Sequence, residues 1–171
     1  MAVRTILHYP DPRLRQAGRR IDAITPAVRN LVDDMAETMY AAPGVGLAAT
    51  QVGELVQLFV VDCAAEGEPS DLRVFINPEI LSVEGKVTFD EGCLSFPGAR
   101  EEVERGERVR VRAQDREGRW FELEAEGLLA IAIQHEYDHL QGVLMIDHLG
   151  PLKKRLINRK MQKRAEAGAG A

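Results

Sequence analysis

The run Gln-His-Glu-Tyr-Asp-His at residues 134–139 constrains this chain more than any other stretch. It has the form HExxH. Residues four apart lie on one face of a helix, so His135 and His139 are positioned to bind one metal ion. Glu136 stands beside a ligand, where a carboxylate can accept a proton from a metal-bound water. Two histidines do not complete a metal site, so another part of the chain must supply a further ligand.

The residues from Leu128 to Ile133, just before this run, are apolar on every side of a helix. We predict a helix from Gly127 to Gln141, closed by Gly142 in the C-cap position and buried at the centre of the fold. The middle of the chain is rich in short β-branched runs. The predicted fold is therefore α+β, with antiparallel β-sheets wrapped around a central metal-binding helix.

The other elements follow from residue spacing and turn residues. Thr25-Pro26 predicts the start of an N-terminal amphipathic helix that ends near Ala41. The expected strands are 55–61, 73–76 and 80–83, with a hairpin formed by 107–113 and 119–125. Residues 3–8 should be extended, and a basic C-terminal helix is expected over 151–165. No linker divides the sequence, so we expect a single catalytic domain over 1–171.

Bulk composition places the chain among ordinary globular proteins, with 171 residues of which 45% are hydrophobic. Its longest apolar run is far too short to span a bilayer, and no secretory signal is present. Two cysteines in a chain without an export signal favour free or metal-bound thiols. We therefore expect a cytoplasmic protein whose partners include neither DNA nor a membrane.

The third metal ligand does not lie downstream of the HExxH run. In the longer metallopeptidase form HExxHxxGxxH, a histidine would occupy the position of Met145, and His148 is three residues too late. The only later glutamate is Glu166, in the basic tail. Upstream, Cys93 lies between Gly92 and the turn-forming residues 96–98, and a thiolate with two imidazoles and a water is a sound catalytic set. The alternative is a buried cysteine in a turn.

The segment Gly44-Val45-Gly46 opens a GxGxxA pattern that ends close to Gln51. A dinucleotide-binding turn with this pattern follows a strand and opens a helix, whereas this segment follows a helix and leads into a strand. We interpret it as backbone that a ligand approaches closely, with Gln51 as a neutral donor and acceptor. A plain helix-to-strand turn is the alternative.

Three runs together, GVGLAATQ at 44–51, EGCLS at 91–95 and QHEYDHLQG at 134–142, resemble the signature motifs of the peptide deformylases. The opening Ile6 to Arg15 and the stretch Leu149 to Lys153 are also similar to this family. The resemblance covers essentially the whole chain, and three motifs in this order and spacing are highly specific. With no insertions and an extended C-terminal helix, the chain is similar to the Gram-negative type.

The resemblance implies a metal-dependent hydrolase that removes the formyl group from the N-terminal formylmethionine of newly synthesised polypeptides and releases formate. The metal ligands that it implies are Cys93, His135 and His139. The ion would be Fe(II), with Ni, Co or Zn as substitutes. Glu136 would be the general base and acid, while the Leu94 backbone N–H and the Gln51 side-chain amide would stabilise the oxyanion.

The same resemblance implies further roles around the metal. The implied substrate-binding residues are Gly44, Val45 and Gly46 for the peptide backbone, Ile131 and Ala132 beside His135 for the methionine side chain, and Arg100 for the following residues. Glu91 and Arg105 match a buried ion pair that supports the cysteine loop.

The charge of the chain is uneven, because its net value is −5 while the residues from Gly150 onward carry seven Lys/Arg and one Glu. The tail is either a solvated helix docked by its first turns, with a short apolar stripe of Leu149, Leu152 and Leu156, or a helix that contacts the phosphates of ribosomal RNA. Two rival functions stay open. One is an HExxH metallopeptidase, and the other is a non-enzymatic ribosome-associated module with a structural zinc, in which Cys63 would be the fourth ligand.

Overall fold

The helix that carries the HExxH run lies at the centre of the fold. A computed structural model describes residues 2–169, and in it this helix, α2, spans Gly127–Leu140, close to its predicted bounds. The segment from Ala130 to Glu136 is buried throughout, as its all-round apolar character predicts. Gly142 has φ 77°, and its N–H donates to the His139 carbonyl at 3.1 Å, so it caps the helix in the left-handed conformation.

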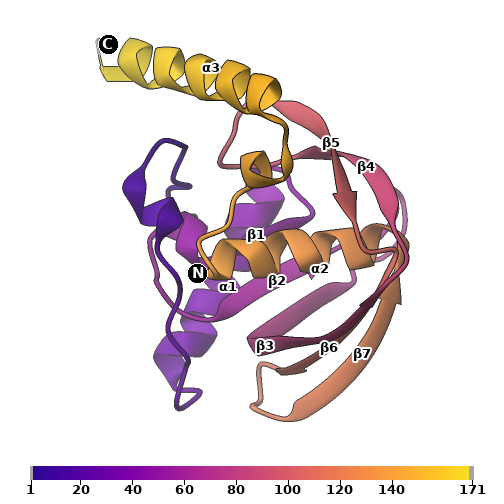
Figure 1. Cartoon of the computed structure of the whole chain (residues 1–171). Helices are drawn as coiled ribbons and strands as arrows, with labels where there is room; N and C mark the ends of the chain where they lie inside the picture. The colour runs from indigo at the N-terminus through magenta and orange to yellow at the C-terminus, as the bar shows by residue number, and fades with distance from the viewer. Residues whose placement is uncertain (1, 170–171) are drawn as a thin grey trace.

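Two antiparallel sheets surround α2 (Figure 1). The larger sheet has the order β1-β2-β3-β6-β7, and the smaller pairs β4 with β5. The strands are β1 Gly46–Ala48, β2 Leu58–Asp62, β3 Leu72–Glu84, β4 Val87–Gly92, β5 Arg100–Arg105, β6 Arg108–Gln114 and β7 Trp120–Glu126. The α+β fold predicted from the sequence, with strands wrapped around a central helix, is therefore confirmed.

The first helix, α1, spans Pro26–Ala41 as predicted, and its N-cap Thr25 accepts a hydrogen bond from the Val28 N–H at 3.3 Å. It covers one face of the larger sheet, while α2 covers the other. In β2, Leu58 and Val60 belong to the core beneath α1, whereas Phe59 and Val61 belong to the core beneath α2. This strand is buried on both faces, which explains its continuous apolar sequence.

One strand replaces two that the sequence predicts. The segments 73–76 and 80–83 are parts of the continuous β3, with a register shift between Ile76 and Glu79. Asn77 has φ 52°, and its side-chain amide hydrogen-bonds the backbone N–H and carbonyl of Ile21. Asparagine tolerates the left-handed conformation, and the bulge accommodates the following proline, so a turn-like sequence lies inside a strand.

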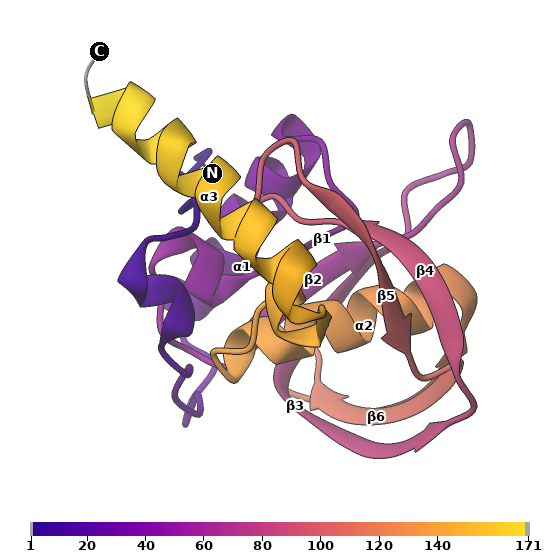
Figure 2. The ribbon, with the colours of Figure 1, turned by 45° about the horizontal axis from the view of Figure 1, so that its top comes forward.

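The sequence analysis did not predict the β4–β5 hairpin, because both of its faces carry charged residues. Its register pairs Glu91 with Glu101 and Gly92 with Arg100, so Cys93 begins the connection between the two strands. Within that connection, the Phe96 N–H donates to the Cys93 carbonyl at 2.9 Å. The hairpin therefore places residues 93–99, which we call the cysteine turn, beside the face of α2 that carries His135 and His139 (Figure 2).

The C-terminal helix α3 spans Pro151–Ala169 and is longer than the predicted 151–165. The predicted apolar stripe is wrong for this helix, because Leu152 and Leu156 are 67% and 54% exposed. Ile157 and Met161 instead dock the helix, in a cluster with Phe96 and Val103. The docking surface therefore starts one turn later than expected and lies over the cysteine turn.

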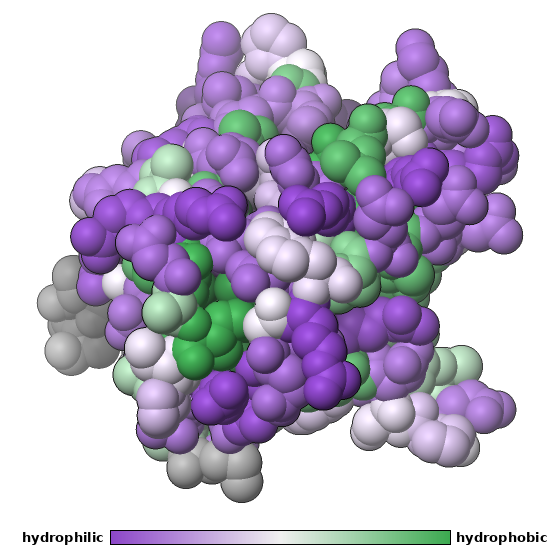
Figure 3. Space-filling view, turned by 90° about the horizontal axis from the view of Figure 1, so that it is seen from below, coloured by the Kyte–Doolittle hydropathy of each residue, from purple (hydrophilic) through white to green (hydrophobic). Residues whose placement is uncertain are grey.

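Residues 3–8, for which an extended segment was predicted, belong to no helix or strand, and the Leu7 N–H donates to the Gln51 carbonyl at 2.7 Å. Within residues 2–169, no helix is long and apolar enough to cross a membrane. The face of the molecule in Figure 3 is mostly hydrophilic, with its hydrophobic side chains in separate patches.

Candidate metal centre and active site

One cysteine from the cysteine turn and two histidines from α2 lie close together. The ligand atoms of Cys93, His135 and His139 all lie within 4.8 Å of one another. The two histidines are one helical turn apart, and Cys93 Sγ lies 3.3 Å from Nε2 of His139. A thiolate sulfur with two imidazole nitrogens is a donor set that suits a divalent transition metal, and three protein ligands leave a coordination position open.

Glu91 fixes the orientation of His135, since its Oε1 lies 2.8 Å from the imidazole Nδ1. This contact leaves Nε2 of His135 free to bind a metal. Glu91 also forms a bidentate pair with Arg105, with contacts of 2.8 and 3.0 Å between side chains only 4% and 3% exposed. Burial by itself would raise the pKa of Glu91, but hydrogen bonds from His135 and Arg105 outweigh it and lower the pKa to about 2.

Arg105 has a second set of partners that the sequence analysis missed. Its Nη1 donates to Asp138 Oδ2 at 2.6 Å, and Nε2 of His148 lies 2.8 Å from the same oxygen. His148 therefore belongs to the support of the arginine and not to the group of metal ligands. Asp138 lies within the HExxH run, and its placement one residue before His139 is the only sequence signal for this contact.

Glu136 is a buried carboxylate beside the metal ligands. Its Oε1 has no hydrogen-bond partner among the described residues, and burial raises the pKa of the carboxyl to about 7. A Cβ atom added to Gly46 would lie 2.6 Å from Oε2 of Glu136. The second glycine of the GxGxxA pattern therefore makes room for the carboxylate. An unpaired buried acceptor beside a thiolate and imidazole set fits a site that a metal and its water complete.

Gln51 is held with its amide nitrogen towards the cysteine turn. Its Oε1 accepts the Ala48 N–H at 3.0 Å, and its Nε2 donates to Ser95 Oγ at 3.0 Å and lies 3.7 Å from Cys93 Sγ. The bond from Ala48 assigns the two ends of the amide, because only the oxygen accepts. Ser95, which positions this amide, was not singled out from the sequence.

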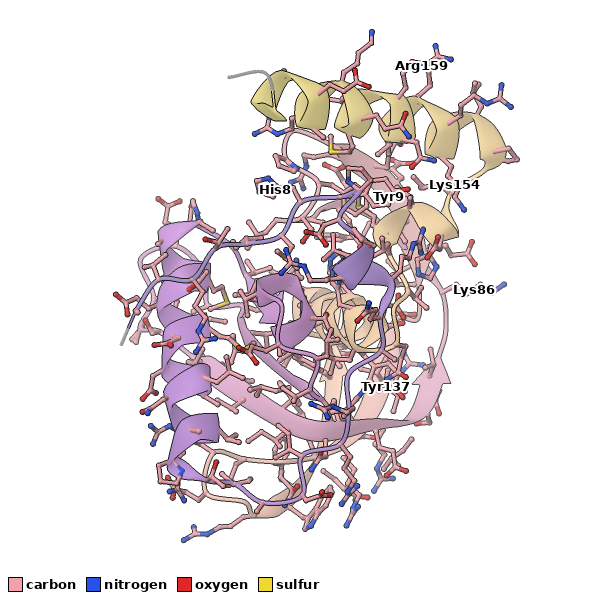
Figure 4. The ribbon with its side chains drawn as sticks, turned by 90° about the vertical axis from the view of Figure 1, so that its left-hand side faces the viewer. His8, Tyr9, Lys86, Tyr137, Lys154 and Arg159 are labelled. Carbon is pink, nitrogen blue, oxygen red and sulfur yellow. The ribbon has the colours of Figure 1, made fainter. Side chains whose placement is uncertain are left out.

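The N-terminal segment holds the cysteine turn from outside. The Tyr9 N–H donates to the Ser95 carbonyl at 2.8 Å, and the Tyr9 ring stacks on Phe96 at a centroid distance of 5.0 Å. Figure 4 shows Tyr9 beneath α3. This turn therefore has rigid contacts on both sides.

A pocket of about 840 Å³ opens onto these groups. Most residues predicted for the site line it, namely Gly44, Val45, Gly46, Gln51, Glu91, Cys93, Leu94, Arg100, Ile131, Ala132, His135 and Glu136. His139 and Arg105 are buried behind the lining. The lining also includes residues that the sequence analysis did not predict, among them Ile6, His8, Phe89, Leu128 and Arg164.

Cys63 does not join the metal ligands, so the structural-zinc alternative loses its fourth ligand. The only group of at least three candidate ligands within reach of one another in residues 2–169 is the one built on Cys93. Cys63 packs against the core beneath α2, and burial raises the pKa of its thiol to about 11. A protonated thiol is a poor metal ligand.

Comparison with known proteins identifies the family. The family model described as polypeptide deformylase matches residues 3–155. The chain belongs to this family. Among curated deformylases, it is 54% identical over 168 residues to the peptide deformylase of Alkalilimnicola ehrlichii, covering 98% of this chain and 94% of that protein. It is 53% identical over 164 residues to peptide deformylase 1 of Burkholderia multivorans, covering 95% and 90%.

Solved deformylase structures have the same fold. The peptide deformylase of Legionella pneumophila superposes with a TM-score of 0.91 at 45% identity, covering 98% of each chain. That of Ehrlichia chaffeensis in complex with actinonin superposes with a TM-score of 0.91 at 36% identity, covering 96% of this chain and 98% of that one. The enzymatic activity of this chain is thus that of a peptide deformylase, and Cys93, His135 and His139 form its metal-binding group.

Proposed function

We propose that this deformylase removes the formyl group from the N-terminal formylmethionine of nascent polypeptides in the cytoplasm and releases formate. The observation that carries the proposal is the meeting, in one pocket, of a thiolate and imidazole metal group with an unpaired buried carboxylate, Glu136. We take residues 1–171 as one catalytic domain, because α2, the larger sheet and the hairpin all contribute to this pocket.

The metal is proposed to be Fe(II), with Ni, Co or Zn as substitutes, held by Cys93 Sγ, His135 Nε2 and His139. When bound, the ion supplies Lewis-acid chemistry, because it lowers the pKa of a water and polarises a carbonyl oxygen. Glu91 keeps His135 aligned for this ion, and Arg105 keeps Glu91 ionised. Metal analysis of anaerobically purified protein checks the identity, with one iron per chain as the expected content.

Glu136 is proposed as the general base and then the general acid. Its raised pKa lets the carboxylate take a proton from the attacking water and return it to the amine nitrogen as the C–N bond breaks. The absence of a side chain at Gly46 leaves the space in which this carboxylate moves between the two tasks.

Two donors are proposed for the negative charge that develops on the formyl oxygen. Nε2 of Gln51 is held beside Cys93 by the bonds to Ala48 and Ser95, so it is preorganised. The N–H of Leu94 lies in the cysteine turn and has no acceptor among residues 2–169. A preorganised donor costs little rearrangement during the reaction, which is why two fixed amides are effective here.

Backbone at Gly44-Val45-Gly46 is proposed to hold the peptide. β1 is an edge strand that pairs only with β2, so its other edge can add an extended peptide as a further strand. Ile131 and Ala132 form the wall that receives the methionine side chain. Arg100 stands at the rim of the pocket, although its guanidinium is already held by Asp90 at 3.1 Å.

The outward face of α3 is proposed to contact the ribosome through phosphates. Arg155, Arg159 and Lys163 are exposed cations on this helix, and no carboxylate pairs with them among the described residues. Replacing all three by glutamine should weaken binding to ribosomes and reduce its dependence on salt. Ribosome binding equal to that of the wild type would rule out this contact. Substitution is a better test than truncation, since α3 buries Ile157 and Met161.

Product analysis tests the proposed reaction. Formyl-Met-Ala-Ser is incubated with metal-loaded enzyme, and formate and the free tripeptide are quantified together, with acetyl-Met-Ala-Ser as the matched control. We expect equal amounts of formate and Met-Ala-Ser and slow reaction of the larger acetyl group. Cleavage inside the peptide, without formate, would support the metallopeptidase alternative and overturn the proposal.

A further inference from the structure

The inner face of α3 reaches the substrate pocket. Ile157 and Met161 are buried against the cysteine turn, and Lys160 Nζ donates to the Gly98 carbonyl at 2.6 Å. Arg164 lies seven residues after Ile157 and three after Met161, so it shares their face of the helix. It lines the pocket together with Gly98. The family match ends at residue 155, so this wall comes from a part of the chain that the match does not include.

The N-terminal segment forms the opposite wall at this end of the pocket. His8 and Ile6 line it together with Arg164. Partial burial and the Arg164 charge lower the pKa of His8, which favours the neutral form of its imidazole. Figure 4 shows His8 beneath α3, on the side that faces the body of the molecule. Among the residues that line this end of the pocket, Arg164 therefore carries the positive charge, while the nearby Lys160 ammonium is held by the Gly98 carbonyl.

The Arg164 charge is not neutralised by the protein. The other cation of the lining, Arg100, is paired with Asp90, and the lining carboxylate Glu91 is paired with the buried Arg105. No carboxylate lies within 4.0 Å of the Arg164 guanidinium among the residues that the structure describes. An unpaired cation in a peptide-binding pocket attracts a substrate carboxylate and repels a substrate ammonium group.

We infer that Arg164 is a specificity-determining residue, which favours formylated peptides with an acidic side chain downstream of the formylmethionine over peptides with a basic one. The inference rests on the proposed function, because it needs the peptide to run through this pocket. It assigns the inner face of α3 to the substrate, whereas the outward cations are assigned to the ribosome. An extended peptide advances about 3.3–3.6 Å per residue, so a positional scan locates the residue that Arg164 meets.

The experiment measures kcat/KM for formate release from formyl-Met peptides of five further alanines, in which one alanine at a time is replaced by Glu, Gln or Lys. At one position we expect wild-type enzyme to prefer Glu over Lys by roughly 1.5- to 5-fold, the range of exposed charge pairs. The preference should shrink at high salt. The ratio of kcat/KM for the Glu peptide to that for the Lys peptide should fall towards one in Arg164→Gln. It should stay above one in Arg164→Lys and drop below one in Arg164→Glu.

Arg159→Gln is the matched control, because Arg159 has the same charge on the same helix but points away from the body in Figure 4. It should keep the wild-type preference for Glu. This inference alone would be overturned if wild-type enzyme released formate with equal kcat/KM from the Glu and Lys peptides at every position. It would also be overturned if Arg164→Gln kept the wild-type difference in kcat/KM. Absence of formate release from every peptide by wild-type enzyme would overturn the proposed function as well.

Discussion

Oε1 of Glu91 lies 2.8 Å from Nδ1 of His135, so a residue two positions before the cysteine ligand orients a histidine ligand on another element. The hairpin and α2 are joined at this contact. Because Glu91 is in turn clamped by Arg105, the geometry of the metal group depends on a buried ion pair as well as on its three ligands.

Replacing Glu91 by glutamine should lower metal affinity by about 10- to 100-fold, as expected when a partner that orients a ligand is lost. The reason is the loss of the charged acceptor for His135, together with the loss of the bidentate carboxylate partner of buried Arg105, which keeps only its ion pair with Asp138. Competition with a chelator measures the affinity. Asp90→Asn is the matched control, since Asp90 is the exposed neighbour of Glu91 and touches no ligand. Equal affinity in Glu91→Gln and wild type would show that the contact is dispensable.

Replacing Gln51 by alanine should reduce kcat by about 100- to 1000-fold with metal still bound, the usual effect of losing one oxyanion donor. Its Nε2 is the side-chain donor held beside Cys93. Steady-state kinetics on formyl-Met-Ala-Ser, with metal content measured on the same sample, separates catalysis from metal loss. Turnover close to that of wild type would remove Gln51 from the mechanism.

Replacing Gly46 by alanine should reduce activity strongly, because the new Cβ would lie 2.6 Å from Oε2 of Glu136 and displace the carboxylate. Metal content should stay near one per chain, since no ligand is touched. Gly150→Ala is the control, because an added Cβ there meets nothing within 4 Å. Full activity in Gly46→Ala would mean that Glu136 tolerates displacement.

Asp147 should make stability depend on pH below neutrality. Burial favours its neutral form, but the hydrogen bond from Arg15 and the Leu144 N–H outweigh burial and lower its pKa in the folded state. A lowered folded pKa gives stability that is present above about pH 4 and is lost as the pH falls through the folded value. Urea unfolding from pH 6 to pH 3 should therefore show a shallower loss of stability in Asp147→Asn than in wild type. Parallel curves would contradict this account.

The sequence predicted those parts of the fold in which local signals agree with packing. The helix of Pro26–Ala41 has a Thr-Pro start and helical apolar spacing, and the HExxH helix has an all-round apolar stem. The β4–β5 hairpin was missed because its charged residues hide the alternation that marks a strand. The prediction of the buried face of α3 was wrong because the face by which a helix docks depends on tertiary contacts.

The candidate site was predictable where motifs carry the chemistry. His135, His139 and Glu136 came from the HExxH run itself. The roles of Cys93 and Gln51 came from the resemblance of three motifs to the deformylases, because spacing alone left each of them open. Ser95 and Arg164 were not predictable, because their roles depend on which segments meet in space. Arg164 is one of several cations in a basic tail, and only the docking of α3 through Met161 distinguishes it from Arg159.

The central claim is that Glu136 moves the proton in deformylation. It is tested most directly by formate release from formyl-Met-Ala-Ser with metal-loaded wild type and metal-loaded Glu136→Gln, each with its metal content measured. We expect one metal per chain in both proteins, steady formate release by the wild type, and a loss of about 100-fold or more in the variant. Formate release by metal-loaded Glu136→Gln at the wild-type rate would contradict the proposed role of Glu136.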